Sequence, residues 1–127
     1  MRPASRLAAA LAPLLGLADA LPAAAGEADV VAIEAVPEDG GTTWRFSVTL
    51  RHDDAGWDHY ADKWEVVAPD GRVLATRVLL HPHEAEQPFT RTLGGVAVPE
   101  GIVAVTLRGH DSVHGYGGRE TTVPLRR

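Results

Sequence analysis

The sequence contains no cysteine and a single methionine, which is Met1. The absence of cysteine excludes a disulfide framework, a thiolate metal site, a cysteine nucleophile and a lipid attached through cysteine. Methionine thioethers are ligands that favour Cu(I), so a thioether copper site is excluded beyond residue 1 as well. A folded domain of this composition depends on its apolar core for stability.

Positive charge is also scarce, and no basic patch with interleaved aromatic residues is present. Lys and Arg number 12 against 17 Asp and Glu, which gives a net charge of −5 with neutral histidine. Nucleic-acid binding draws most of its affinity from cationic contacts to phosphate, so nucleic acid is an unfavourable partner for this chain.

The first residues have the three parts of a secretory signal peptide. Arg2 and Arg6 precede the apolar run 7–17, and the small-residue stretch 22–25 follows it. This order predicts a signal peptide over residues 1–25, cleaved after Ala25 or alternatively after Ala20. A membrane anchor is disfavoured because Pro13 interrupts a run that falls short of about 20 apolar residues. We therefore expect a periplasmic or secreted protein without stable membrane insertion after cleavage.

Residues 26–127 are expected to form one all-β domain, an immunoglobulin-like sandwich of about seven antiparallel strands. Glycine and proline punctuate this region, and β-branched and apolar runs lie between them. In the clearest strand, apolar residues from Trp44 to Leu50 alternate with polar ones, so one face is expected in the core. The expected strands are 29–36, 42–51, 63–68, 73–80, 88–93 with a continuation at 96–98, 102–109 and 119–125.

Several side chains are expected to point inward from these strands. Trp44 and Trp64 are interpreted as core residues that fill the space between two sheets. Two apolar sets are each expected to share an inward face: Leu74, Val78 and Leu80 on one strand, and Val103, Val105 and Leu107 on another.

The chain resembles two groups of proteins, one in its overall pattern and the other in three short stretches. The number of strands, the length and the turn residues resemble those of immunoglobulin-like and fibronectin type III domains. The stretches 56–62, 81–83 with 87–90, and 110–117 resemble those of a group of small exported bacterial proteins without known activity. The resemblance implies a fold and a compartment, and it implies no function.

All six histidines fall in three segments that the predicted topology brings to one end of the sandwich, which predicts a divalent metal site there. Imidazole suits Zn²⁺ and Cu²⁺, and three or four convergent nitrogens make a competent site. The candidate ligands are His52, His59, His81, His83, His110 and His114. Nearby carboxylates could be alternative ligands or could orient the imidazoles: Asp53, Asp54, Asp58, Asp62, Glu84, Glu86 and Asp111.

Other interpretations stay open. Each histidine taken alone could be an ordinary loop, surface or core residue. The same loops could instead form a metal-free surface for a protein partner, as loops on a sandwich often do. Trp57 is expected to pin its loop, while Tyr60 and Tyr116 could pin loops or anchor a partner. A third interpretation is catalysis, either by a metal-activated water or by Ser112 beside a histidine. The sequence around Ser112 is not that of a nucleophile elbow.

Overall fold

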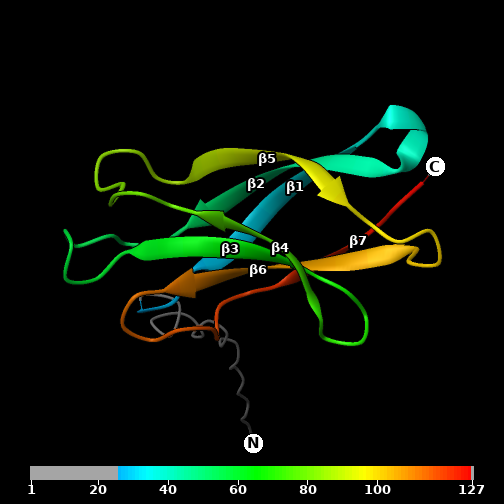
Figure 1. Cartoon of the computed structure of the whole chain (residues 1–127). Coiled ribbons are helices and arrows are strands. Elements are labelled where there is room, and N and C mark those ends of the chain that lie inside the picture. The colour runs from blue at the N-terminus through cyan, green and yellow to red at the C-terminus, as the bar shows by residue number, and fades with distance from the viewer. Residues whose placement is uncertain (1–25, 127) are drawn as a thin grey trace, which may run out of the picture.

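The computed structural model describes residues 26–126, which form two antiparallel sheets packed face to face (Figure 1). One sheet has the strand order β1-β2-β5 and the other β4-β3-β6-β7. The all-β sandwich expected from the sequence is confirmed. The predicted signal peptide, residues 1–25, lies outside the described residues. The strand bounds are β1 (Asp29–Glu38), β2 (Thr43–Arg51), β3 (Ala61–Val67), β4 (Val73–Val78), β5 (Phe89–Ala97), β6 (Ala104–Asp111) and β7 (Thr121–Pro124).

The central strand β2 contributes the middle of the core, as its alternating sequence predicts. Trp44, Phe46, Val48 and Leu50 are all buried, and the intervening residues are exposed or half-buried. Trp64 of β3 faces them from the other sheet and is fully buried. Each large apolar side chain removed from water in this way contributes roughly 1.5–3 kcal/mol to stability. This packing holds the two sheets at a fixed separation.

Two of the predicted sets of inward-pointing apolar residues are only partly correct. Val78 is 54% exposed and Leu80 is 75% exposed, whereas Leu79 between them is buried. The alternation at the end of β4 has the opposite phase to the predicted one. Leu79 extends the pairing with β3 by donating its backbone N–H to the carbonyl of Asp62, and it is Leu79 that points inward between the exposed Val78 and Leu80. Val103 is likewise 68% exposed, because β6 begins only at Ala104.

Two glycines allow backbones to approach closely at the edge where the N-terminal segment crosses the second sheet. A Cβ atom at Gly109 would lie 2.9 Å from the Cβ of Ala28, and one at Gly118 would lie 1.9 Å from the Ala28 carbonyl oxygen. The hydrogen bond from the Val30 N–H to the Arg119 carbonyl then links the start of β1 to the segment before β7. Larger residues at these two positions would push the N-terminal segment away.

The chain directions bring three loops to one end of the sandwich, as the topology argument predicted (Figure 1). Strands β4 and β6 both pair antiparallel with β3, so both end at the same side of their sheet. We call this end, made of loops 52–60, 79–88 and 112–120, the histidine pole. The other end, made of turns 39–42, 68–72 and 98–103, is called the turn pole. Within residues 26–126 no helix is both long and apolar enough to cross a membrane.

Candidate metal centre

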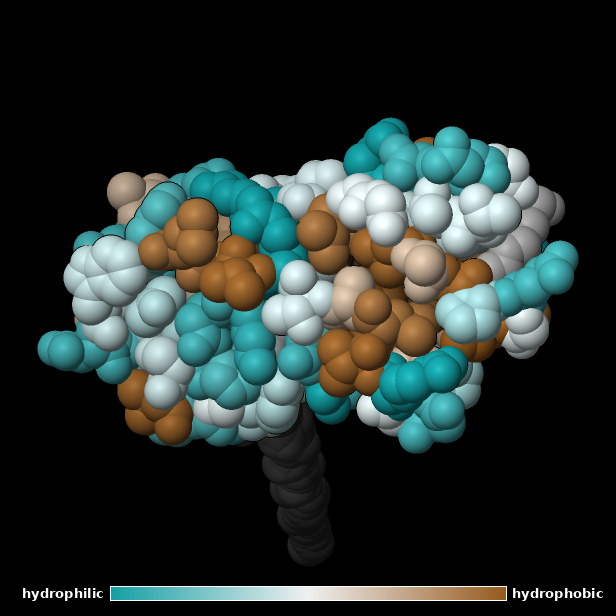
Figure 2. Space-filling view, viewed as in Figure 1, coloured by the Kyte–Doolittle hydropathy of each residue, from teal (hydrophilic) through white to brown (hydrophobic). Residues whose placement is uncertain are grey.

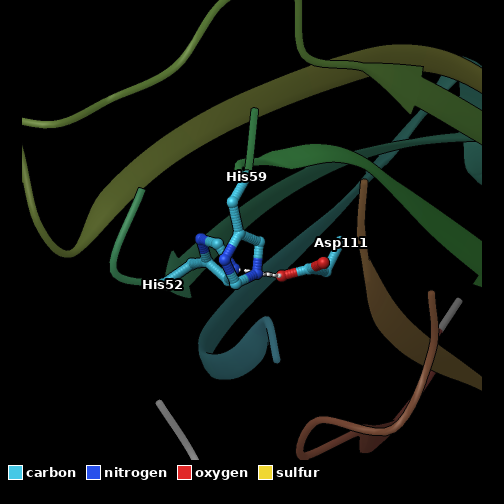
Figure 3. Close-up of side chains that lie close together, drawn as sticks. All are labelled: His52, His59 and Asp111. Carbon is cyan, nitrogen blue, oxygen red and sulfur yellow. Dashed lines mark hydrogen bonds and ion pairs between the residues drawn. The ribbon is translucent and has the colours of Figure 1, made fainter. Parts of the chain in front are cut away.

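Two histidines and one aspartate meet at the histidine pole (Figure 3). One ligand atom from each of His52, His59 and Asp111 lies within 4.8 Å of the other two. The Nε2 atoms of both histidines approach the same oxygen, Oδ2 of Asp111, and the distance from His59 is 2.6 Å. The three side chains therefore converge on one point with a carboxylate oxygen at its centre.

Strand alternation and loop geometry put these residues in place. His52 directly follows β2 and keeps its inward parity, so its side chain is fully buried. Asp111 is the last residue of β6 and is also fully buried. His59 reaches the site from loop 52–60, where the Ala55 N–H bonds to the His59 carbonyl. Because 25% of the His59 side chain is exposed, the site has an opening to solvent at this residue.

The second carboxylate of the centre is Asp54, whose side chain is fully buried. Its Oδ1 atom contacts Nδ1 of His52 and accepts a hydrogen bond from the Ala61 N–H at 3.1 Å. Its Oδ2 atom accepts the backbone N–H of His83 at 2.6 Å. The His52 ring is thus held between two carboxylates, one at each ring nitrogen.

Asp111 is held in its ionised form by hydrogen bonds. Burial raises the pKa of its carboxyl, but donation from the backbone N–H groups of His114 and Val113 and from the rings of His52 and His59 outweighs burial and lowers that pKa. The two backbone bonds go to Oδ1, at 2.7 Å and 2.6 Å. Oδ2 is therefore left to the histidines.

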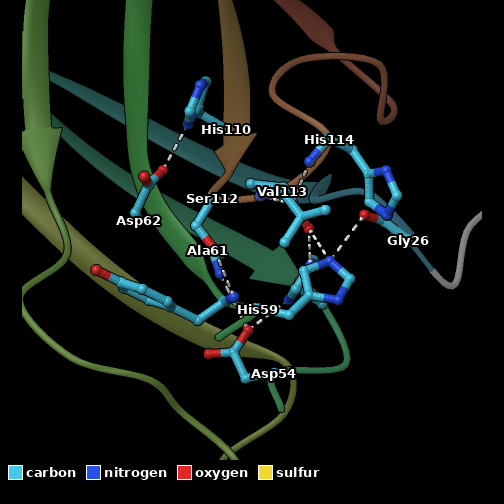
Figure 4. Close-up of polar contacts among 12 residues, drawn as sticks. Gly26, Asp54, His59, Ala61, Asp62, His110, Ser112, Val113 and His114 are labelled. Carbon is cyan, nitrogen blue, oxygen red and sulfur yellow. Dashed lines mark hydrogen bonds and ion pairs between the residues drawn. The ribbon is translucent and has the colours of Figure 1, made fainter. Parts of the chain in front are cut away.

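His114 lies beside the centre without entering it (Figure 4). Its ring is edge-on to that of His59, with centroids 5.0 Å apart. Near the same place Nε2 of His59 lies 3.3 Å from the Gly26 carbonyl oxygen. A Cβ atom at Gly26 would lie 2.8 Å from Nε2 of His114, so a larger residue here would require the exposed His114 ring to move aside. His114 is the nearest additional imidazole on the open side of the centre.

His81 and His83 form a separate pair. The buried ring of His83 stacks on Phe89 with a centroid distance of 4.0 Å, and the exposed His81 ring lies 4.7 Å from it. Gln87 ties this segment to the centre, because its Oε1 accepts the His52 N–H and its Nε2 donates to the His83 carbonyl. This bridging role of Gln87 was missed in the sequence, since nothing in the histidine pattern points to an amide.

His110 lies on the outer face of the β3–β6 pair, away from the centre. Its Nδ1 atom is 2.6 Å from Asp62, and its ring is edge-on to Tyr116. The Tyr116 hydroxyl donates to Glu65. Burial raises the pKa of Glu65, but hydrogen bonds from Arg108 and Tyr116 outweigh it and lower that pKa. This outer cluster fixes loop 112–120 against the sheet.

The remaining sequence candidates lie at the surface or have other partners. Asp53, Asp58 and Glu84 are exposed and are outside the three-residue group. The Ser112 hydroxyl accepts a hydrogen bond from the Tyr60 N–H at 3.0 Å. Trp57, which was expected to pin its loop, is 66% exposed and contacts Tyr60 edge-on, so it does not anchor the loop in the core.

Comparison with known proteins finds one similar curated protein. The chain is 48% identical over 97 residues to a protein of Halomicrobium mukohataei that is named "Putative lipoprotein". The matched region is 76% of this chain and 47% of that protein, so the chain spans about half the length of the curated relative it matches. No family model matches the chain, and no solved structure matches it. The resemblance to immunoglobulin-like domains therefore stays a prediction.

Proposed function

We propose that this chain is an exported protein that binds one divalent transition metal ion, Cu²⁺ or Zn²⁺, through His52, His59 and Asp111. The observation that carries the proposal is the convergence of two imidazole nitrogens and one carboxylate oxygen within 4.8 Å. Export is supported by the signal-peptide pattern and by the name of the similar protein.

The donor set suits these ions. Two imidazoles and one carboxylate are a known combination for zinc, and imidazole also suits copper. Tetrahedral ligand atoms around zinc lie about 3.3 Å apart, so His59 Nε2 and Asp111 Oδ2 would separate by less than about 1 Å to admit the ion. A small rotation of the partly exposed His59 ring supplies that movement, and the contact between the buried His52 Nε2 and Asp111 Oδ2 must open as well.

The surroundings of His52 also favour a metal ligand. Its Nδ1 atom faces Asp54 while its Nε2 atom faces the centre. A carboxylate behind the imidazole fixes the ring orientation and the tautomer that leaves Nε2 free for the ion. Asp54 would then act on the ion through His52. His114 is placed to supply a fourth ligand from the open side.

Calorimetric titration of the purified, tag-free protein with Cu²⁺, Zn²⁺ and Ni²⁺ tests the proposal. We expect saturation at one ion per chain near pH 7.5 and weaker binding near pH 5.5, because protons compete for the imidazoles. Metal binding should also release protons, so the apparent heat should change with the ionisation enthalpy of the buffer.

Two single variants make the test specific. His59→Ala removes a partly exposed ligand and should weaken binding by at least about tenfold. His110→Ala removes a histidine outside the centre and should leave the affinity unchanged. Binding no tighter than about 1 mM, or equal affinity in both variants, would show that the centre is not a metal site.

A metal-free interaction surface is the second candidate function. Trp57, Val113 and Tyr116 at the histidine pole are 66%, 57% and 39% exposed. Figure 2 shows apolar residues on the viewed face in separate groups divided by polar ones. Exposed aromatic side chains in loops are common anchors for a protein partner. If the titration shows no metal binding, these loops are the surface to test for partners.

A further inference from the structure

A small pocket of about 90 Å³ lies between the end of β4 and the start of β5, at the edge of the histidine pole. Its lining combines cationic, imidazole and apolar side chains, and none of the lining residues is acidic. This composition is unusual in a chain that carries a net charge of −5. The lining residues are Arg77, Leu79, Leu80, His81, His83 and Arg91.

The two guanidinium groups are held in place mainly by backbone carbonyls. Arg77 donates from Nε to the Thr92 carbonyl at 3.0 Å and from Nη1 to the Val78 carbonyl at 2.6 Å. Arg91 donates from Nη1 to the Thr90 carbonyl at 2.7 Å. Carbonyl acceptors orient a guanidinium without neutralising its charge, so further N–H groups stay available for an anion.

Arg91 has one acidic partner as well. Its Nη2 atom lies 3.1 Å from Oε1 of Glu86, and the Glu86 side chain is 56% exposed. An exposed ion pair of this kind contributes little and is screened by salt. Arg91 can therefore exchange this contact for a ligand in the pocket.

His83 is a buried residue of the pocket lining whose imidazole ring lacks hydrogen-bond partners. Its residue is only 6% exposed, and neither ring nitrogen has a hydrogen-bond partner among the described residues. Nδ1 lies 3.9 Å from Oδ2 of the buried Asp54, beyond hydrogen-bond distance, so Nε2 is the atom left for a ligand. Burial, together with the charges of Arg91 and His81, lowers the pKa of His83, and Asp54 and Glu86 oppose this only in part. A buried polar group without a partner is costly, and an anion would relieve that cost.

We propose that this pocket binds a small oxyanion, a phosphate or a carboxylate, between Arg77 and Arg91, with His81 and His83 as additional donors. The exposed His81 ring lies against the His83 ring and must turn aside for a ligand oxygen to reach Nε2 of His83. Two arginines disfavour a metal cation here. The oxyanion site is thus distinct from the proposed metal centre and does not depend on it.

The test is an NMR titration of the metal-free protein with inorganic phosphate and, separately, with acetate, at constant ionic strength set with chloride. We expect saturable shifts confined to residues 77–83 and 89–92. Saturation by phosphate alone, by acetate alone or by both supports the proposal and identifies which oxyanion the pocket takes.

Three arginine variants provide the contrast. Arg77→Gln and Arg91→Gln should each weaken binding by at least about tenfold, because each removes a charge-assisted hydrogen bond. Arg72→Gln is the matched control, since Arg72 is exposed in the turn between β3 and β4 and bonds there through its backbone. Shifts that never saturate, or equal affinity in all three variants, would overturn the proposal.

Discussion

The two poles of the sandwich are built by different kinds of contact. At the turn pole the closing hydrogen bonds are local: Thr42 to Asp39, Gly71 to Ala68 and Ile102 to Pro99. The histidine pole has local bonds too, such as Gly115 to Asp111, but its buried side chains also make contacts that join distant parts of the chain. The His52–Asp111 contact spans 59 positions, and the bond from the His83 N–H to Asp54 spans 29.

This difference determines how each pole should respond to substitution. A local turn loses only its own hydrogen bond when one residue changes, and solvent replaces the lost partner. The histidine pole shares its acceptors, since Asp111 accepts from two rings and two backbone N–H groups. Removing one shared acceptor leaves several buried donors without partners, and the individual costs accumulate.

The largest effect is expected for Asp111→Ala. The substitution leaves a buried imidazole and two backbone donors unpaired, so it should lower the free energy of unfolding by about 3–5 kcal/mol. Urea unfolding followed by tryptophan fluorescence measures this change. Asp111→Asn keeps two acceptor positions on Oδ1 and should cost less. A loss below about 1 kcal/mol for Asp111→Ala would show that the network is weak.

A smaller effect is expected from pH, and His83 is the residue that reports it. Its pKa is lowered from an ordinary value of 6.5, so below that pH the unfolded chain binds more protons than the folded chain. The His83 contribution is therefore complete above pH 6.5 and is lost as the pH falls toward the folded pKa.

Urea unfolding of the wild type and of His83→Phe at about pH 7.5 and about pH 5.5 isolates this contribution. Phenylalanine retains the stacking on Phe89 and does not titrate. The wild type should lose more stability across this interval than the variant does. Equal losses would mean that His83 keeps its ordinary pKa in the folded protein.

The smallest effect is expected at the turn pole, for Asp70→Ala. The side chain of Asp70 accepts one hydrogen bond, from the Arg72 N–H at 3.0 Å, and it is exposed. Its removal should lower the free energy of unfolding by about 0.5–1 kcal/mol. The same urea measurement checks this value. A cost as large as that of Asp111→Ala would remove the distinction between the poles.

The sequence predicted the fold well wherever strand alternation continues. Trp44 to Leu50 alternate without interruption, and each expected core residue of β2 is buried. The prediction failed where apolar residues stand next to one another and leave the phase of the alternation open, and also beyond a strand end. Val78 and Leu80 were assigned inward although Leu79 between them is the buried residue, and Val103 was assigned inward by extending the alternation past the start of β6.

The site could be predicted as a region and not as a set of contacts. The antiparallel course of the strands brings all six histidines toward one pole, but the path of each loop decides which of them meet. His59 reaches Asp111 because its loop turns at Gly56, which has a φ of 67°. His110 is only one position from Asp111, yet strand alternation points it to the opposite face of the sheet. Asp111 was predicted as an alternative ligand, and it lies at the centre.

The contact between His52 and Asp111 joins the two sheets of a protein that has no sulfur bridge. His52 follows β2 of the first sheet, and Asp111 ends β6 of the second. Such a cross-link closes a long loop of chain, which is the arrangement from which a disulfide would gain its stabilising effect. A reducing agent would leave this link intact, whereas protonation of Asp111 would weaken it, and the lowered pKa of that carboxyl moves this loss below the ordinary range of an aspartate. The link is thus insensitive to the redox state of its compartment and is lost only in strong acid.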